Sequence, residues 1–297
     1  MADKQVVLIT GCSFGLGTNI AMEYANDPRK CYKVWAAVRV DDDSELIKKM
    51  AGNLLDDTLF VCSIDLTVKN SIESTVDMIL KTDGKIDILV NNAVCTFFSP
   101  FETLDIDSGR KVMEINLFGH ARLIHLLIPG MKERRHGRII SIGSIGAVGY
   151  NGIFNEYFSG SKCALESLTT DLNAQLRPYN VWLSVLHPRA VRTERPMKVF
   201  ESRDYQDHVR LTEKVDEVTN KMFQERLDQL ANAFKPECQA QDPEETAKII
   251  KDITEKEEPF AVYQSDQIGV YVASKFCKDT TGEALVKHVR STLEHTY

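Results

Sequence analysis

The chain has 297 residues, of which 43% are hydrophobic and 27% are charged, a balance that is typical of soluble globular proteins. Its 36 lysines and arginines are outnumbered by 43 aspartates and glutamates, and the formal net charge of -7 argues against a nucleic-acid-binding surface. The seven cysteines include no C-x-x-C pair and the histidines show no metal-ligand spacing, so we expect a reduced, cytoplasmic protein without a metal site.

Seven short apolar runs, rich in valine and isoleucine, alternate with longer amphipathic stretches. They cover residues 6–10, 34–38, 59–64, 86–90, 138–143, 181–187 and 260–263. Strands that are buried on both faces of a parallel sheet have this pattern, and each gap is long enough for one crossover helix. We therefore expect an α/β fold with a Rossmann-type doubly wound parallel sheet, in a single domain over residues 1–297. We expect no secretory leader before the first run and no membrane span, because no apolar run is long enough.

A glycine-rich loop, TGCSFGLG at residues 10–17, follows the first predicted strand and opens a helix. Glycines let the backbone approach a pyrophosphate, and the amide groups of a helix N-terminus then face its negative charge. This loop predicts a dinucleotide site. Its candidate residues are Gly11, Ser13, Gly15, Leu16 and Gly17.

The end of the second predicted strand distinguishes the two nicotinamide cofactors. An acidic residue there would bind the adenosine ribose and select NAD, but this chain has Val38 followed by Arg39. Arg39 and Ser13 are suited to a 2′-phosphate, although the acidic residues at 41–43 could weaken its binding. We therefore predict NADP as the cofactor.

The segment from about residue 193 to residue 235 departs from the alternation of strands and helices. It is helical in pattern and heavily charged, and it lies between the sixth and seventh predicted strands. Two interpretations stay open: a solvated pair of helices, or a lid over the site.

Several motifs occur in an order and spacing that resemble one family. They are the glycine loop, DLT at 65–67, NNAV at 91–94, INLFG at 115–119, SIGS at 141–144 and SK at 161–162. The chain resembles the short-chain dehydrogenases/reductases over nearly its whole length. TGCS, AVR after the second strand and PGMKERRHGRI further resemble the branch of the type 1 17β-hydroxysteroid and photoreceptor-type retinol dehydrogenases.

The resemblance implies roles for four catalytic residues. A tyrosine exchanges a proton with the substrate oxygen, a lysine lowers the tyrosine's pKa and binds the nicotinamide ribose, a serine binds the substrate oxygen, and an asparagine holds a relay water. The catalytic candidates are Asn116, Ser144, Tyr157 and Lys162, and the further cofactor contacts implied are Asp65, Asn92, Lys162, Val191 and Thr193.

The tyrosine departs from the family's pattern, because Phe158 and not Tyr157 lies four residues before Lys162. Helix residues four apart differ by about 40° around the axis, whereas residues five apart differ by about 140°. Counted from Ser144, however, Tyr157 has the expected spacing. If the loop before residue 154 absorbs one extra residue, Phe158 fills the site; if a π-bulge absorbs it, Tyr157 does. Loops accept insertions more readily, so we favour Phe158.

Val94 and Arg189 are two further departures near the same site, each standing where the family has a glycine. We expect an NADP(H)-dependent oxidoreductase that acts on a hydroxyl or carbonyl of a lipid-like substrate, of the steroid or retinoid class, with weak or altered activity. The alternatives are a cofactor-binding pseudoenzyme and an enzyme repurposed for different chemistry. The resemblance also implies a homodimer formed through segments 107–133 and 155–177, where we noted Leu123, Leu127, Leu165 and Leu168.

Overall fold

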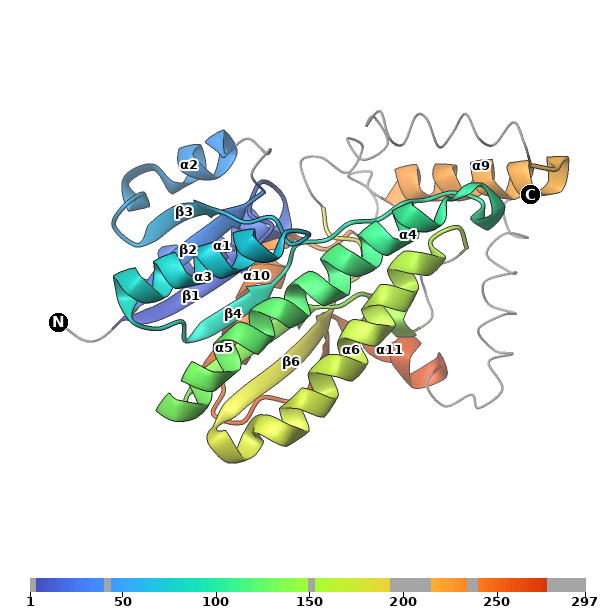
Figure 1. Cartoon of the computed structure of the whole chain (residues 1–297). Helices are drawn as coiled ribbons and strands as arrows, with labels where there is room; N and C mark the ends of the chain where they lie inside the picture. The colour runs from blue at the N-terminus through green and yellow to red at the C-terminus, as the bar shows by residue number, and fades with distance from the viewer. Residues whose placement is uncertain (1–3, 40–43, 149–152, 193–214, 234–239, 277–297) are drawn as a thin grey trace.

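A single parallel sheet forms the centre of the computed structural model, which describes residues 4–39, 44–148, 153–192, 215–233 and 240–276 (Figure 1). The strands are β1 Gln5–Thr10, β2 Tyr32–Val38, β3 Leu59–Ser63, β4 Ile88–Asn91, β5 Gly137–Ile142, β6 Val181–His187 and β7 Val262–Gln264. Their order is β3-β2-β1-β4-β5-β6-β7, and every pairing is parallel. The predicted Rossmann-type fold class is confirmed, and all seven predicted runs contain strands.

Helices occupy the connections between strands. They are α1 Leu16–Ala25, α2 Glu45–Ala51, α3 Lys69–Asp83, α4 Ile106–Met113, α5 His120–Arg134, α6 Glu156–Leu176, α9 Glu217–Ala233, α10 Pro243–Glu255 and α11 Gln267–Phe276. Within the part of the chain that the structure describes, no helix combines the length and apolar character needed to cross a bilayer. Helix α9 is the described part of the charged segment that we predicted at about 193–235, and the remainder lies outside the described residues.

The core is divided between the two faces of the sheet, because successive residues of each strand point to opposite sides. In β1, Val7 and Ile9 belong to a cluster that α1 and α10 cover, whereas Val6 and Leu8 belong to a cluster that α3 and α5 cover. Both faces of the sheet are therefore buried beneath helices. This explains why the strands read as continuous apolar runs in the sequence.

The direction of winding reverses between β1 and β4. The chain passes from β1 outward to β2 and β3, then crosses back so that β4 pairs with the other side of β1. In open α/β sheets the carboxyl ends of the strands on either side of such a switch enclose the ligand crevice. The glycine-rich loop and the NNAV motif both lie at this edge.

A π-helical turn over Glu114–Gly119 joins α4 to α5, so that the two helices form one continuous rod (Figure 1). One extra residue in a helical turn changes the direction of every side chain that follows it. The turn contains Asn116, whose side chain is fully buried. It therefore directs a candidate catalytic residue into the protein.

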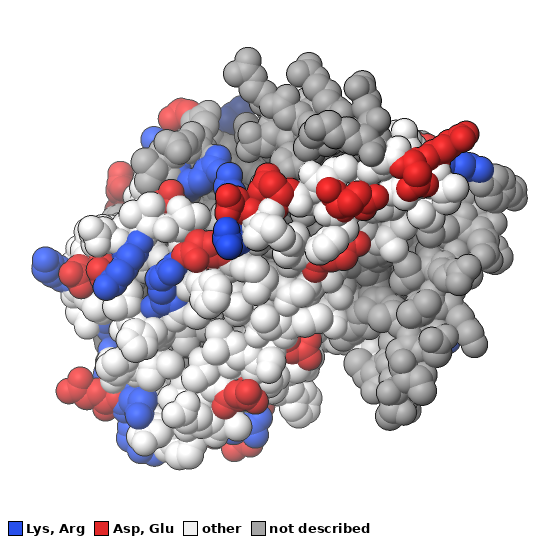
Figure 2. Space-filling model, turned by 45° about the vertical axis from the view of Figure 1, so that its right-hand side comes forward, with Lys and Arg blue, Asp and Glu red and all other residues white. Residues whose placement is uncertain are grey.

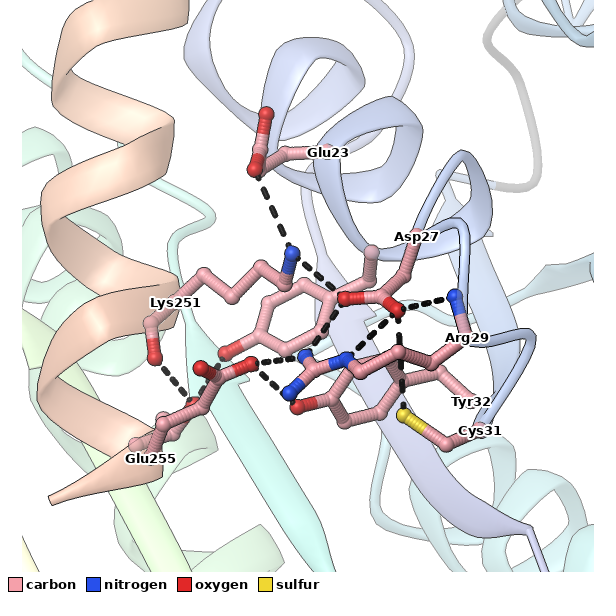
Figure 3. Close-up of polar contacts among 9 residues, drawn as sticks. Glu23, Asp27, Arg29, Cys31, Tyr32, Lys251 and Glu255 are labelled. Atoms are coloured by element: carbon pink, nitrogen blue, oxygen red, sulfur yellow. Dashed lines mark hydrogen bonds and ion pairs between the residues drawn. The ribbon is translucent and has the colours of Figure 1, made fainter.

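Polar side chains connect the end of α1 to α10, on the same face of the sheet (Figure 3). Asp27 is nearly fully buried and accepts hydrogen bonds from the Arg29 guanidinium at 2.8 and 2.6 Å, and Lys251 Nζ lies 2.7 Å from Asp27 Oδ2. Glu255 accepts a hydrogen bond from Tyr32 at 2.7 Å and pairs with Arg29. The hydrogen bonds from Arg29, followed by those from Lys251, hold the pKa of Asp27 well below its usual range.

We expect Asp27→Asn to lower the free energy of unfolding at pH 7 by about 1.5–3 kcal/mol, because it removes charge-assisted hydrogen bonds from a buried group. The folded pKa of Asp27 lies below the unfolded value of about 3.9, so its contribution is present above that pH and is lost as the pH falls toward the folded pKa. Urea unfolding between pH 7 and pH 3 should show this loss in the wild type and a flatter dependence in the variant.

Asp107→Asn is the matched control, because Asp107 forms an ion pair with Arg110 in which both side chains are more than 70% exposed. An exposed pair of this kind contributes about 0–1 kcal/mol. Equal effects of the two substitutions at pH 7 would contradict a stabilising role for the Asp27 cluster.

Candidate active site

The glycine-rich loop packs tightly against the end of β4. A Cβ atom on Gly17 would lie 2.2 Å from the Gly11 carbonyl oxygen and 2.5 Å from Asn92 Nδ2. Asn92 Nδ2 donates to the carbonyl oxygens of Thr10 at 2.9 Å and Gly11 at 3.2 Å. Asn92 thus ties β4 to β1 across the switch point. Contacts within the protein itself therefore require a glycine at position 17.

The N-terminus of α1 has the features of an anion-binding site. Gly15 caps the helix in a backbone conformation with a φ of 70° and provides no side-chain hydrogen bond to the first turn. The amide groups of that turn therefore face the loop that holds Ser13 and Leu16. A helix N-terminus that lacks a side-chain cap and follows a glycine loop fits the pyrophosphate of a dinucleotide.

The predicted adenosine contacts lie at the neighbouring strand ends. Arg39 is exposed immediately after β2, while Val38 is buried. Asp65 is half-buried after β3, and its Oδ1 accepts hydrogen bonds from the backbone and hydroxyl of Thr67 at 2.8 and 2.7 Å. Val191 is half-buried after β6, whereas Thr193 and the acidic residues at 41–43 lie outside the described residues.

Lys162 is the centre of the predicted catalytic group. Its side chain is buried, and Nζ donates a hydrogen bond to the Ile142 carbonyl oxygen at 2.6 Å, at the carboxyl end of β5. Burial lowers the pKa of Lys162 to about 7. The lysine can therefore change its protonation state near neutral pH, which is the range in which a proton relay works.

Two aromatic residues, Tyr157 and Phe158, precede Lys162 on α6. The helix is α-helical throughout Glu156–Leu176, so Phe158 lies about one turn before Lys162, with its ring centroid 5.6 Å from Nζ. The Tyr157 ring is stacked on Phe101 at 5.6 Å and lies against Gly109 of α4, where a Cβ atom would be 2.5 Å from Tyr157 Cζ. Phe158 thus faces the lysine, and Tyr157 faces α4. Which of the two lies beside a nicotinamide ring stays a prediction.

Asn116 holds the loop that follows β4. Its Oδ1 accepts from the Cys95 amide at 2.7 Å, and its Nδ2 donates to the Cys95 carbonyl oxygen at 2.8 Å and to Ser161 Oγ at 3.0 Å. Ser161 in turn donates to the Phe158 carbonyl oxygen at 2.7 Å. The side chain of Asn116 is thereby engaged by the protein, and its part in a proton relay stays a prediction.

Ser144 lies at the carboxyl end of β5 and is nearly buried, with its hydroxyl accepting a hydrogen bond from the Gly146 amide at 3.0 Å. Val94 is 55% exposed. The Nε of Arg189 donates to Asp266 at 2.6 Å, so the charge of Arg189 is balanced within the protein.

Three further residues of this region were not identified from the sequence. His120 and His187 are fully buried, and Glu166 lies one turn after Lys162 on α6. Burial, followed by the charge of Lys162, lowers the pKa of His120 to about 3, so its imidazole is neutral. The spacing of four residues between Lys162 and Glu166, and between Asn116 and His120, was the available signal, because such residues share a helix face.

Helix α9 contacts the segment that precedes α6. Phe223 of α9 is buried and packs edge-to-face against Phe154, with ring centroids 5.2 Å apart. Phe154 lies two residues before the start of α6. The charged segment is therefore attached by an aromatic contact close to Tyr157 and Phe158.

Residues 5–204 match the family described as short chain dehydrogenase. The chain is 38% identical to human retinol dehydrogenase 8 over 194 residues, covering 65% of this chain and 61% of that protein. It is 32% identical to human 17-beta-hydroxysteroid dehydrogenase type 1 over 247 residues, covering 83% and 73%. The chain thus spans about three fifths of the length of retinol dehydrogenase 8.

Solved structures have the same fold. A short-chain dehydrogenase from Streptomyces avermitilis is 24% identical, with a TM-score of 0.72 over 100% of both chains. A serine dehydrogenase complexed with NADP+ is 21% identical, with a TM-score of 0.70 over 88% of this chain and 94% of that one. From the motifs, the sheet order and the family match together, this chain belongs to the short-chain dehydrogenase family.

Proposed function

We propose that this chain is an NADP(H)-dependent oxidoreductase that acts on a hydroxyl or carbonyl group of a lipid-like substrate, of the steroid or retinoid class. The observation that carries this proposal is Lys162, buried and held at the carboxyl end of β5 with a pKa lowered to about 7. Support for the substrate class comes from the relatives named for retinol and 17-beta-hydroxysteroids.

The cofactor supplies or takes up a hydride when it is bound. In this proposal the glycine loop and the N-terminus of α1 hold its pyrophosphate, and Arg39 with Ser13 binds its 2′-phosphate. Ser144 hydrogen-bonds the substrate oxygen. Lys162 stabilises negative charge near that oxygen and binds the nicotinamide ribose.

Redox turnover of the native chain is low in this proposal, because Phe158 faces Lys162 and has no hydroxyl group that could donate a proton. Tyr157, which has such a hydroxyl, is stacked on Phe101 and lies against Gly109. A positioned general acid contributes about 10²–10⁴-fold to rate. The same observation favours one alternative, a pseudoenzyme that binds the cofactor without catalysing redox chemistry.

A panel of steroids, retinoids and simple carbonyl compounds, with the absorbance of the cofactor as the readout, tests the proposal. We expect slow but measurable turnover with at least one lipid-like compound. Lys162→Met keeps the length of the side chain and removes its charge, so it should abolish that turnover while the protein stays folded. Cofactor binding with no turnover on any compound, in the wild type or in Phe158→Tyr, would support the pseudoenzyme instead.

Arg39→Ala should narrow the difference in affinity between NADPH and NADH. A hydrogen-bonded contact between guanidinium and phosphate contributes about 1.5–3 kcal/mol net, so we expect wild type to bind NADPH at least about tenfold more tightly than NADH. Calorimetric titration measures both affinities. NADH is the internal control, because it lacks the 2′-phosphate and its affinity should not change. Equal binding of the two cofactors by wild type would contradict the choice of NADP.

A homodimer and a cytoplasmic location are also proposed. Leu123, Leu127 and Leu165 are buried in the monomer core, and only Leu168 of the four noted leucines is even partly exposed. Phe118, 50% exposed in the π-helical turn, is a better interface candidate. Figure 2 shows that much of the face it draws is uncharged, below a broken line of acidic side chains. Sedimentation should give a dimer that Phe118→Asp weakens.

A further inference from the structure

His187, at the carboxyl end of β6, is fully buried beside the candidate catalytic serine. The Ser144 amide donates a hydrogen bond to His187 Nδ1 at 3.0 Å. On the other side of the ring, Nε2 lies 3.0 Å from Glu166 Oε2. Nε2 forms no hydrogen bond within the described residues, so this second contact is electrostatic.

The imidazole continues the pairing of β5 and β6 beyond the last ladder residues. The Gly143 amide donates to the Leu186 carbonyl oxygen at 2.8 Å, and the Ile145 amide donates to the Pro188 carbonyl oxygen at 3.1 Å. Between them, the Ser144 amide donates to the ring of His187. A side-chain nitrogen thus satisfies a buried backbone donor that would otherwise lack a partner.

The contact specifies one form of the ring. Nδ1 can accept a hydrogen bond only when it carries no proton, and in a neutral imidazole the proton is then on Nε2. The negative charge of Glu166 beside Nε2 stabilises a proton there. The absence of a side chain at Gly143 leaves room for the ring, because a Cβ atom at that position would lie 2.5 Å from Nδ1.

One face of α6 makes all of these connections. Lys162, Glu166 and Thr169 follow a spacing of four and three residues, and residues so spaced share a helix face. Lys162 contacts the Ile142 carbonyl oxygen, Glu166 contacts His187, and Thr169 donates to Ser141 Oγ at 3.2 Å. The helix that positions the lysine therefore also positions the histidine.

We propose that His187 is a positioning residue for Ser144, and that Glu166 holds it in the Nε2–H form. This proposal rests on the proposed function only for the catalytic role of Ser144. The location of the Ser144 backbone is fixed by the ring, and the serine hydroxyl is thereby held at a constant distance from Lys162. A misplaced serine would lower turnover without changing nucleotide binding.

The first test uses the wild-type protein and needs no activity. Nitrogen-15 NMR of the histidine rings should show His187 with a protonated Nε2 and an unprotonated Nδ1. Glu166→Leu should make the other tautomer detectable. A protonated Nδ1 in the wild type would overturn the proposal.

The second test compares two amide replacements of His187. Asparagine places its oxygen close to the position of Nδ1 and can accept from Ser144, whereas glutamine reaches toward Glu166 and cannot. We expect hydrogen exchange of the Ser144 amide to be near the wild-type rate in His187→Asn and about tenfold faster in His187→Gln. The amide of Leu89 in the sheet core is the control and should be unchanged in both. Equal rates at Ser144 in the two variants would overturn the proposal.

Turnover is the third readout, measured in a Phe158→Tyr background. His187→Gln should lower kcat about tenfold with the affinity for NADPH unchanged, and His187→Asn should restore most of kcat. If the exchange results hold but no variant turns over substrate, His187 still positions Ser144 and it is the oxidoreductase function that fails. If His187→Gln does not fold, the tautomer of the wild type and of Glu166→Leu decides the proposal.

Discussion

Replacing Phe158 by tyrosine should raise turnover on a steroid or retinoid by about 100-fold or more, because a positioned general acid contributes about 10²–10⁴-fold to rate. The Phe158 ring already faces Lys162, with 5.6 Å between its centroid and Nζ. A phenol added there has an ordinary pKa of about 10, which a neighbouring ammonium group lowers. Steady-state kinetics with NADPH measures the gain.

Tyr157→Phe is the matched control, because it removes one hydroxyl and keeps the ring that stacks on Phe101. It should leave turnover unchanged in both the wild type and the Phe158→Tyr background. Substantial turnover in the wild type that disappears in Tyr157→Phe would show that Tyr157 is the proton donor. That result would reverse our assignment.

Gly17→Ala should weaken NADPH binding by about 10- to 100-fold and destabilise the fold by about 1–3 kcal/mol, because the added methyl group overpacks the loop. Its Cβ atom would lie 2.2 Å from the Gly11 carbonyl oxygen, a backbone atom that cannot move without moving the loop. Titration with NADPH and urea unfolding measure the two effects.

Gly160→Ala is the comparison for this second substitution. Gly160 lies within α6 and is exposed, and an added Cβ atom meets no atom of the described residues within 4 Å. Alanine in a helix interior stabilises by about 0.5–1 kcal/mol relative to glycine, so this variant should gain stability and bind NADPH normally. Normal NADPH binding by Gly17→Ala would show that the glycine loop does not hold the nucleotide.

The sheet could be predicted from the sequence because each strand is buried on both faces and therefore reads as an apolar run. Even the short edge strand β7 was recognised, with its ends displaced by one or two residues. The π-helical turn at Glu114–Gly119 was not, because a one-residue shift in the apolar pattern does not reveal whether the backbone forms a π-turn or a break between two helices there.

The positions of Lys162 and Gly17 at the carboxyl edge of the sheet could be predicted from their places after β5 and β1, whereas their roles stay predictions. The directions of Tyr157 and Phe158 were not, because an insertion can be absorbed by a loop or by a helix and the sequence does not distinguish them. The pairing of His187 with Glu166 also escaped prediction. It depends on which helix covers the ends of β5 and β6, and this follows only from the assembled sheet.

During synthesis on the ribosome, the cluster at Asp27 stays incomplete for most of the chain's length. Helix α1 ends at residue 25, but α10, which supplies Lys251 and Glu255, begins only at residue 243. Until then the apolar cluster that α1 shares with β1 lacks the residues of α10 that cover it, and exposed apolar surface of this kind favours aggregation. A transcript that ended before α10 would therefore encode every candidate catalytic residue and still yield a chain prone to misfolding.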